Sequence, residues 1–243
     1  MDALEPGQLN RLLRDLELTA PVAIRRAVPQ AQLHLWLLIR VRETDVRTDE
    51  AFQQRLVRHI GLRGKLRACK PAVFALLQEM KTRDRPGFED MLERVSRLTG
   101  QVEKSVASSL LGLLDPDQPS IDRDLRELLP RYGFPPLAEA PQFDECVAWH
   151  RGLHALFAQV IGSPRWPSVS SGLDGGLGIA GGAVLSEVRK LNLQLSHSRR
   201  AVALMPTLEL VNANRPARAA AAAAGRSDGT TSPGAQVRLH LCR

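Results

Sequence analysis

Segment 98–131 constrains the fold more than any other part of the chain, because apolar residues recur in it at three- and four-residue steps and two breaks interrupt them. Gly100 follows the first apolar series, at the position past a helix end where a positive φ is needed. Asp115-Pro116-Asp117 ends the second series, since proline cannot continue a helix. The segment therefore predicts helix, tight turn, helix, acidic turn and helix, as part of a hairpin unit over 87–131.

Helical patterns also dominate the rest of the first two thirds of the chain. Thr48-Asp49-Glu50 is a predicted cap for a helix that runs through Ile60, and Pro71 is predicted to open the next one. Further helices are expected over 4–18, 33–41 and 142–161. Aromatic residues make up 4% of the chain. Together these features predict an all-α protein with one helical domain over 1–162.

The character of the sequence changes after Gly162. Residues 163–211 are predicted to form a Gly/Ser/Pro-rich loop plus a short helix, and 204–211 a strand or a loop. Segment 176–181 is a formal match to GxGxxG, but no predicted strand precedes it, so no dinucleotide site and no other cofactor are expected. Residues 212–243 lack core residues and are predicted to be a disordered basic tail, or an out-of-register translation.

The net charge of +7 is unevenly distributed. From Ser196 onward seven arginines stand against Glu209 and Asp228, so residues 1–195 carry little net charge. The three cysteines are widely separated and predict no disulfide framework, which favours a cytoplasmic location. The most apolar run, 33–39, is too short to cross a bilayer, so no membrane association is expected.

The hairpin residues carry a resemblance to a known family. Leu98-Thr99-Gly100-Gln101-Val102-Glu103-Lys104-Ser105 resembles the helix-hairpin-helix of base-excision DNA glycosylases, and Ile121-Asp122 matches the apolar-Asp pair that follows the hairpin. The resemblance implies that Lys104 attacks the sugar C1′ as an amine nucleophile and that Asp122 assists it. It also implies that Gly100 and Gln101 contact a DNA phosphate. Val102 stands where this family has a second hairpin glycine.

A second resemblance covers the same block. Thr99, Gly100, Glu103, Ser105 and Ala107, together with the later Asp115-Pro116 and Asp122, are similar to an uncharacterised group of bacterial all-helical proteins with the pattern TGxxExSxASxL...DPxxPxxD. In that group a small residue usually occupies the position of Lys104. This resemblance implies an all-helical fold and assigns no activity.

Structural explanations compete with the catalytic ones. Asp122 is well placed to cap the third hairpin helix, and Lys104 in a first helical turn is ordinarily solvated. A catalytic lysine needs a depressed pKa, from burial or from nearby positive charge.

Two further groups could bind a ligand. A basic cluster that includes Lys65 and Lys70, with Arg58, Arg63 and Arg67, could contact phosphate, although such runs are usually solvated. Cys146, His150 and His154 share one helix face, but a single helix rarely completes a zinc site, so no metal is predicted.

These observations predict a DNA-associated, helix-hairpin-helix-like protein that lacks full glycosylase activity. One alternative is an active DNA glycosylase or AP lyase that uses Lys104 and Asp122. The other alternative is a non-catalytic helical protein whose partner is a protein, for which an apolar groove and no basic surface beside Gly100 would be the distinguishing sign.

Overall fold

A computed structural model describes residues 4–62, 65–83, 86–178 and 185–213. All regular elements in these ranges are helices, and no strand occurs among them. The elements are α1 (Pro6–Glu43), α2 (Glu50–Ile60), α3 (Lys65–Ala68), α4 (Lys70–Lys81), α5 (Phe88–Thr99), α6 (Lys104–Leu114), α7 (Arg123–Leu128), the 3-10 helix η1 (Leu129–Tyr132), α8 (Phe143–Ile161), α9 (Trp166–Leu177) and α11 (Glu187–Ala213). The predicted all-α class is confirmed.

The chain divides into a compact unit over Met1–Val202 and a second unit over Ala203–Arg243. The compact unit thus extends beyond residue 162, where the sequence predicted the helical domain to end. Residues 214–243, which hold most of the predicted disordered tail, lie outside the described ranges.

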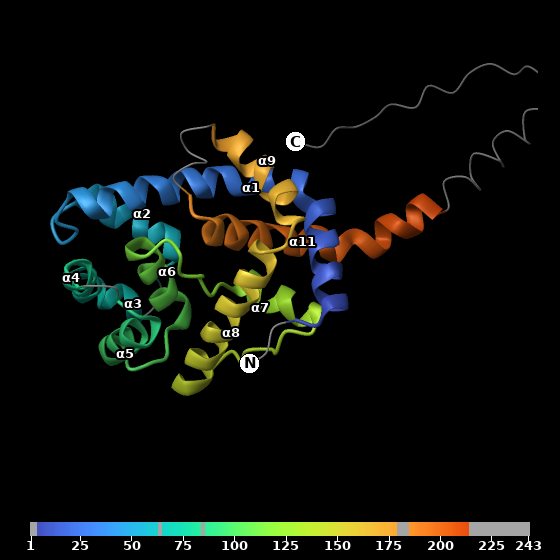
Figure 1. Cartoon of the computed structure of the whole chain (residues 1–243). Helices are drawn as coiled ribbons and strands as arrows, with labels where there is room; N and C mark the ends of the chain where they lie inside the picture. Colours follow the sequence, from blue (N-terminus) through green and yellow to red (C-terminus); the bar gives the residue numbers. More distant parts are fainter. Residues whose placement is uncertain (1–3, 63–64, 84–85, 179–184, 214–243) are drawn as a thin grey trace, which may run out of the picture. The chain divides into compact units, whose positions relative to one another are not determined.

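Helix α1 is the longest element and runs without interruption through Pro21 and Pro29. The sequence predicted separate helices here, because a proline removes one backbone hydrogen bond and crowds the preceding turn. Both proline side chains are exposed, while alanines and leucines on the opposite face are buried. Burial of that long stripe offsets the local cost of the prolines, and Figure 1 shows that α1 bends along its length.

Helix α9 forms where the sequence predicted a loop, and its glycines supply the reason. A Cβ atom placed on Gly172 would lie 2.3 Å from Ile24 Cδ1, and one placed on Gly176 would lie 2.8 Å from Val28 Cγ2. The bare backbone of α9 therefore packs directly on α1. Leu173 adds an apolar contact to this interface, together with Ala27 and Ala31. Gly176, the first glycine of the formal GxGxxG match, has a packing role.

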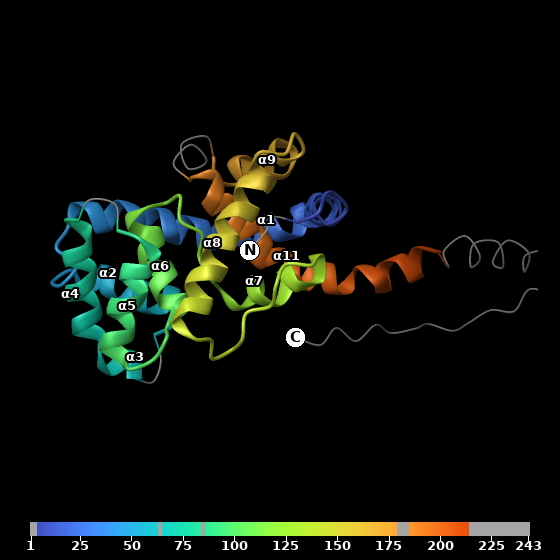
Figure 2. The same cartoon turned by 60° about the horizontal axis from the view of Figure 1, so that its bottom comes forward.

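The three helices predicted in segment 87–131 are present as α5, α6 and α7. Gly100 ends α5 with φ of 69°, and its N–H donates to Ser96 O over 2.8 Å. Asp115 ends α6, whose buried face includes Val106, Leu110 and Leu113. Leu98, expected in the apolar stripe of α5, is 36% exposed, and Thr99 is buried in its place. Figure 2 shows α6 beside α5, in agreement with the many contacts between the two helices.

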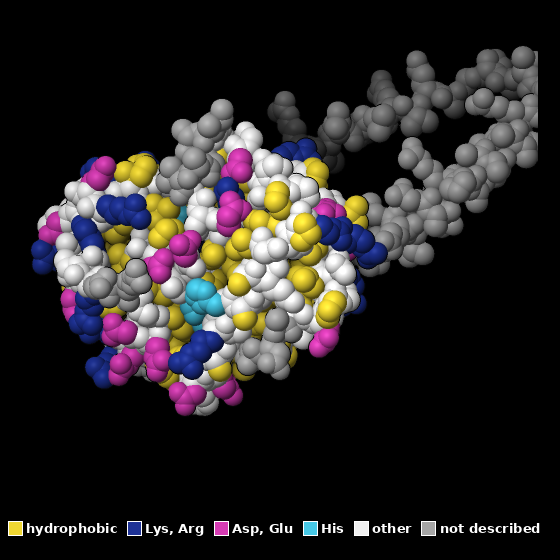
Figure 3. Space-filling view, in the orientation of Figure 1, with side chains coloured by type: hydrophobic (Ala, Val, Ile, Leu, Met, Phe, Trp, Pro, Cys, Tyr) yellow, Lys and Arg dark blue, Asp and Glu magenta, His cyan; other side chains and the backbone are white. Residues whose placement is uncertain are grey.

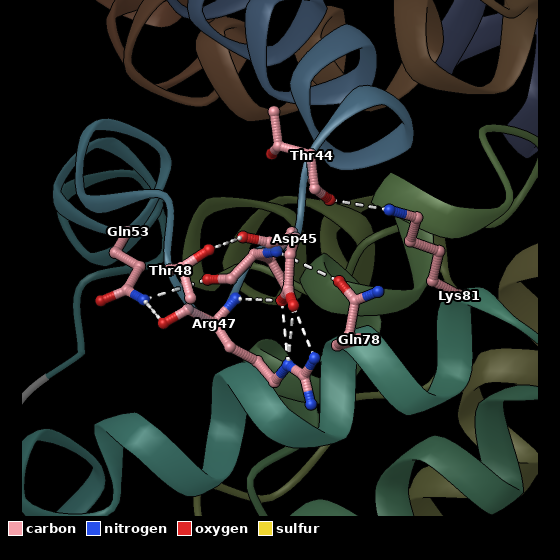
Figure 4. Close-up of polar contacts among 8 residues, drawn as sticks. Thr44, Asp45, Arg47, Thr48, Gln53, Gln78 and Lys81 are labelled. Carbon is pink, nitrogen blue, oxygen red and sulfur yellow. Dashed lines mark hydrogen bonds and ion pairs between the residues drawn. The ribbon is translucent and has the colours of Figure 1, made fainter.

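Hydrogen bonds hold the turn between α1 and α2 (Figure 4). Lys81 Nζ donates to Thr44 O over 2.8 Å, and Val46 N donates to Gln78 Oε1 over 3.1 Å, so that both bonds anchor the turn to α4. Asp49 caps α2 by accepting from Phe52 N over 3.0 Å, as the sequence predicted. These bonds fix the orientation of α2 against α1 and α4.

A buried polar cluster joins α11 to α1 and to the loop before α7. The Arg189 guanidinium donates to the His34 ring and, over 3.0 Å, to Ser120 Oγ. Asn192 Oδ1 accepts from Ser120 N over 2.6 Å. Burial lowers the pKa of Arg189 to about 10, which leaves the guanidinium charged at neutral pH. The cluster lies between distant parts of the sequence, and no local pattern predicts it.

Candidate nucleic-acid interface

A basic hollow lies where α2, α3 and α4 meet. Its volume is about 430 Å³, and three cationic side chains, one amide and two apolar side chains line it: Arg58, Arg67, Lys70, Gln54, Val57 and Leu62. No carboxylate is among these lining residues. The hollow thus combines apolar lining from Val57 and Leu62 with positive charge from three different elements.

The three cations of this hollow differ from several other basic residues of the compact unit. Arg40, Arg83 and Arg94, for example, each form an ion pair with a carboxylate. Within the described part of the chain, no ion pair joins Arg58, Arg67 or Lys70 to an acidic residue. Figure 3 shows the usual arrangement on one face of the molecule, where Lys and Arg side chains interleave with Asp and Glu. Because its cations are unpaired, the basic hollow can accept an anion without first breaking an ion pair.

The hollow adjoins the end of α5. Cys69 Sγ donates a hydrogen bond to Leu98 O over 3.3 Å. Lys70 follows Cys69 directly, and Gly100 comes two residues after Leu98. Three of the residues predicted to contact nucleic acid, Lys70, Gly100 and Gln101, therefore lie on two neighbouring segments. The side chain of Lys65, the fourth, lies outside the described residues.

The hairpin itself presents little charge. A shallow hollow of about 350 Å³ beside Gly100 is lined by Glu93, Ser96, Arg97, Gly100, Gln101, Val102 and Phe143. Its arginine, Arg97, is paired with Glu93 over 2.5 Å. Glu103, which precedes α6, makes no side-chain bond to the first turn of the helix. The arginine beside Gly100 is therefore neutralised by Glu93. Unpaired positive charge lies instead at Lys70 of the basic hollow, next to the Cys69–Leu98 bond.

Lys104 is buried in the first turn of α6, whereas the sequence favoured a solvated position. Its exposed fraction is 7%, and Nζ donates to Glu139 O over 2.6 Å. Burial, followed by the nearby Arg126 charge, lowers the pKa of Lys104. The pKa of the amine is thus shifted in the direction that favours a nucleophile, but its Nζ donates to the backbone carbonyl of Glu139.

Asp122 serves as the N-cap of α7, as the sequence favoured. Its carboxylate accepts from Leu125 N over 2.7 Å and from Ser196 Oγ. Burial raises the pKa of Asp122. Among the described contacts, no hydrogen bond or ion pair joins Asp122 to Lys104, and the two side chains have different partners.

Cys146, His150 and His154 lie along one face of α8, as their spacing predicted. His150 Nε2 lies 3.1 Å from Pro119 O, and His154 Nε2 lies 2.8 Å from Gln118 Oε1. The His150 ring stacks on Phe88, with 3.9 Å between the ring centroids. No group of three or more His, Cys, Asp or Glu side chains in the described ranges is arranged to hold a metal ion.

Sequence reasoning missed one surface feature next to the basic hollow. Trp36 was expected in the core, but its ring is half-buried beneath the exposed side chain of Arg55, with Cζ 4.1 Å from the ring centroid. The two residues come from α1 and α2, and 18 residues separate them in the sequence. No local pattern reveals such a contact.

A larger hollow lies near the ends of α1, α4 and α6, with a volume of about 520 Å³. Its charges are mixed, because Arg42, Lys81 and Arg83 are balanced by Asp115 and Asp117. Lys81 and Arg83 already have partners in Thr44 O and Glu79. This hollow is therefore a weaker anion site than the basic hollow.

Comparisons with protein-family models, with curated proteins and with solved structures gave no match to the chain. The resemblance of 98–122 to the glycosylase hairpin therefore remains a prediction. None of the described helices combines the length and the apolar character needed to cross a membrane.

Proposed function

We propose that the protein associates with DNA by contacting backbone phosphates at the basic hollow, and that it lacks glycosylase activity. The observation that carries this proposal is the set of three unpaired cations, Arg58, Arg67 and Lys70, around a hollow with no lining carboxylate. Phosphate contacts from lysine and arginine supply most of the affinity in sequence-independent DNA binding.

The cationic side chains that line the hollow support phosphate as the ligand. Arg58 and Arg67 can each present a planar guanidinium to phosphate oxygens, and Lys70 adds a point charge. Lys70 Nζ lies 5.7 Å from the centroid of the Phe74 ring, and no ion pair joins the lysine to a described acidic residue. The Cys69–Leu98 bond also places the backbone turn at Gly100 next to the start of α4, which carries Lys70.

The state of Lys104 argues against glycosylase or lyase chemistry. A nucleophilic amine has to reach the sugar C1′ of a DNA substrate, and the Lys104 side chain is buried and donates to Glu139 O. None of the three hollows described above is lined by Lys104 or Asp122. DNA association without chemistry therefore fits these two residues better than the mechanism implied by the resemblance.

A protein partner is the second candidate function. The shallow hollow beside Gly100 includes Val102 and Phe143, and its Arg97 is neutralised by Glu93. An apolar surface without free basic charge at this place is the sign expected of a protein-binding hairpin.

The test is a binding titration of the full chain against fluorescein-labelled duplex, single-stranded and abasic-site DNA. Because the arginines beyond Ser196 also attract DNA, variants are compared with one another. We expect Lys70→Ala to weaken binding to at least one of these DNAs by about fivefold, which corresponds to about 1 kcal/mol. Arg26→Ala, which removes an exposed cation from α1, is the matched control and should have little effect. Equal affinities for the wild type and Lys70→Ala would reject the proposal.

A further inference from the structure

We infer that the nucleic acid bound at the basic hollow is single-stranded, with a phosphate in the hollow and the base of the adjoining nucleotide stacked on Arg55. This inference rests on the proposed function and makes it more specific. It depends on the stack of Arg55 on Trp36, which the phosphate contacts do not use.

The stack presents a flat, charged surface to solvent. The Arg55 guanidinium carbon lies 4.1 Å from the centroid of the Trp36 ring, which is the distance of a cation–π contact. Trp36 is half-buried and Arg55 is exposed, so the guanidinium lies over the ring at the protein surface. The solvent side of the exposed Arg55 side chain can receive a second planar group. Guanidinium planes and aromatic rings are the surfaces on which proteins stack unpaired bases.

The stack and the hollow belong to the same surface. Arg55 lies three residues before Arg58 on α2, and residues at this spacing are neighbours on a helix surface. Gln54, which is adjacent to Arg55 in the chain, also lines the hollow. The turn between α1 and α2 is anchored to α4 (Figure 4), and beyond this turn Arg55 of α2 lies over Trp36 of α1. A nucleotide with its phosphate at Arg58 therefore has a stacking surface one helical turn away.

A single strand matches this arrangement better than a duplex. In a duplex both faces of each internal base are covered by neighbouring base pairs, and exposing one requires unstacking. An unpaired base offers a free face without that cost. Proteins that bind single strands combine a cationic groove with stacking surfaces in the same way.

The test separates stacking from charge. Arg55→Lys keeps the positive charge but removes the planar group. Binding is measured with a thymidine oligonucleotide and with an oligonucleotide of the same length made of abasic spacers, which has the phosphates and no bases. Arg26→Lys is the matched control on α1. Thermal unfolding of each variant confirms that it is folded.

We expect Arg55→Lys to weaken binding of the thymidine oligonucleotide about tenfold and to leave binding of the abasic oligonucleotide unchanged. Arg26→Lys should change neither. An Arg55→Lys effect that is absent, or equal for both oligonucleotides, would overturn the stacking inference. The proposed function is tested separately by Lys70→Ala on the abasic oligonucleotide: a loss there supports phosphate binding even if stacking fails, and no loss would reject phosphate binding itself.

Discussion

The thiol of Cys69 donates a hydrogen bond to the carbonyl oxygen of Leu98 over 3.3 Å, and this bond joins the start of α4 to the end of α5. It connects two regions that the sequence identified separately, the basic cluster and the hairpin. The carbonyl is near the end of its helix, where backbone acceptors lack helical partners. A single weak bond thus helps to hold Lys70 close to the Gly100 turn.

The Cys69 bond leads to the first prediction. Cys69→Ala removes a weak donor from a partly exposed site, so the free energy of unfolding should fall by less than about 1 kcal/mol. DNA affinity should fall by about twofold, because Arg67 and Lys70 lose part of their positioning. Cys69→Ser, which keeps a donor, is the control and should bind like the wild type. Titrations of both variants check this, and an alanine variant with wild-type affinity would show that the bond does not position the hollow.

Asp122 is predicted to act as a helix cap and not as a catalytic group. Asp122→Ala should lower the free energy of unfolding by about 1–2 kcal/mol, because Leu125 N loses its acceptor. Asp122→Asn keeps an acceptor and buries no charge, so it should cost much less. Chemical denaturation of the two variants tests the difference. A cap role would be wrong if asparagine destabilised the chain as much as alanine.

Lys104 is predicted to form no covalent adduct with abasic DNA. Its amine is buried and bonded to Glu139 O, which keeps it away from a bound sugar. Borohydride trapping on an abasic-site duplex should therefore give no Lys104-dependent product. The control is the Lys104→Met variant, which keeps an apolar stem of similar length. An adduct formed by the wild type and lost in Lys104→Met would establish a lyase and overturn this part of the account.

Stability is predicted to fall as the pH decreases below about 6.5. Burial, reinforced by the Arg189 charge, lowers the pKa of His59 to about 4, and burial with the His154 charge lowers that of His150 to about 3. Burial and Arg189 also lower the pKa of His34. The unfolded chain protonates these rings near pH 6.5 while the folded chain keeps them neutral, so stability is present above pH 6.5 and is lost on acidification.

The size of this effect follows from the linkage relation. At pH 5 His59 and His150 should each reduce the free energy of unfolding by about 2 kcal/mol relative to pH 7, and the lowered pKa of His34 acts in the same direction. The raised pKa of Asp122 acts in the opposite direction, but it is a single group, whereas His154 and His197 also have lowered pKa values. Denaturant unfolding at pH 5 to 7 measures the slope, and His59→Gln should make it shallower by one proton. A flat profile over this interval would contradict the assignment.

Local signals predicted the ends of several helices correctly. Asp49, Gly100 and Asp122 each act within a few residues of the helix end that they define, so the sequence alone was sufficient. The fold differed from the prediction where contacts between residues far apart in the sequence determine the secondary structure. The run of α1 through Pro21 depends on burial of its opposite face, and helix α9 depends on the approach of Gly172 to Ile24.

The candidate site divides in the same way. The basic residues around Lys70 could be identified from the sequence, because they cluster within a short segment. Their lack of acidic partners and their closeness to Gly100 could not be predicted from the sequence, because both depend on how α4 and α5 pack together. The stack of Arg55 on Trp36 also joins two helices, and no periodicity within either helix indicates it.

The salt dependence of DNA binding tests the central claim most directly. Each cation that contacts a phosphate contributes about one unit to the slope of log affinity against log salt. The double variant Arg58→Ala/Lys70→Ala should therefore bind single-stranded DNA with a slope smaller by about two than that of the wild type. The control Arg25→Ala/Arg26→Ala, with two exposed cations removed from α1, should keep the wild-type slope. Equal slopes for the wild type and the Arg58→Ala/Lys70→Ala variant would contradict phosphate binding at the basic hollow.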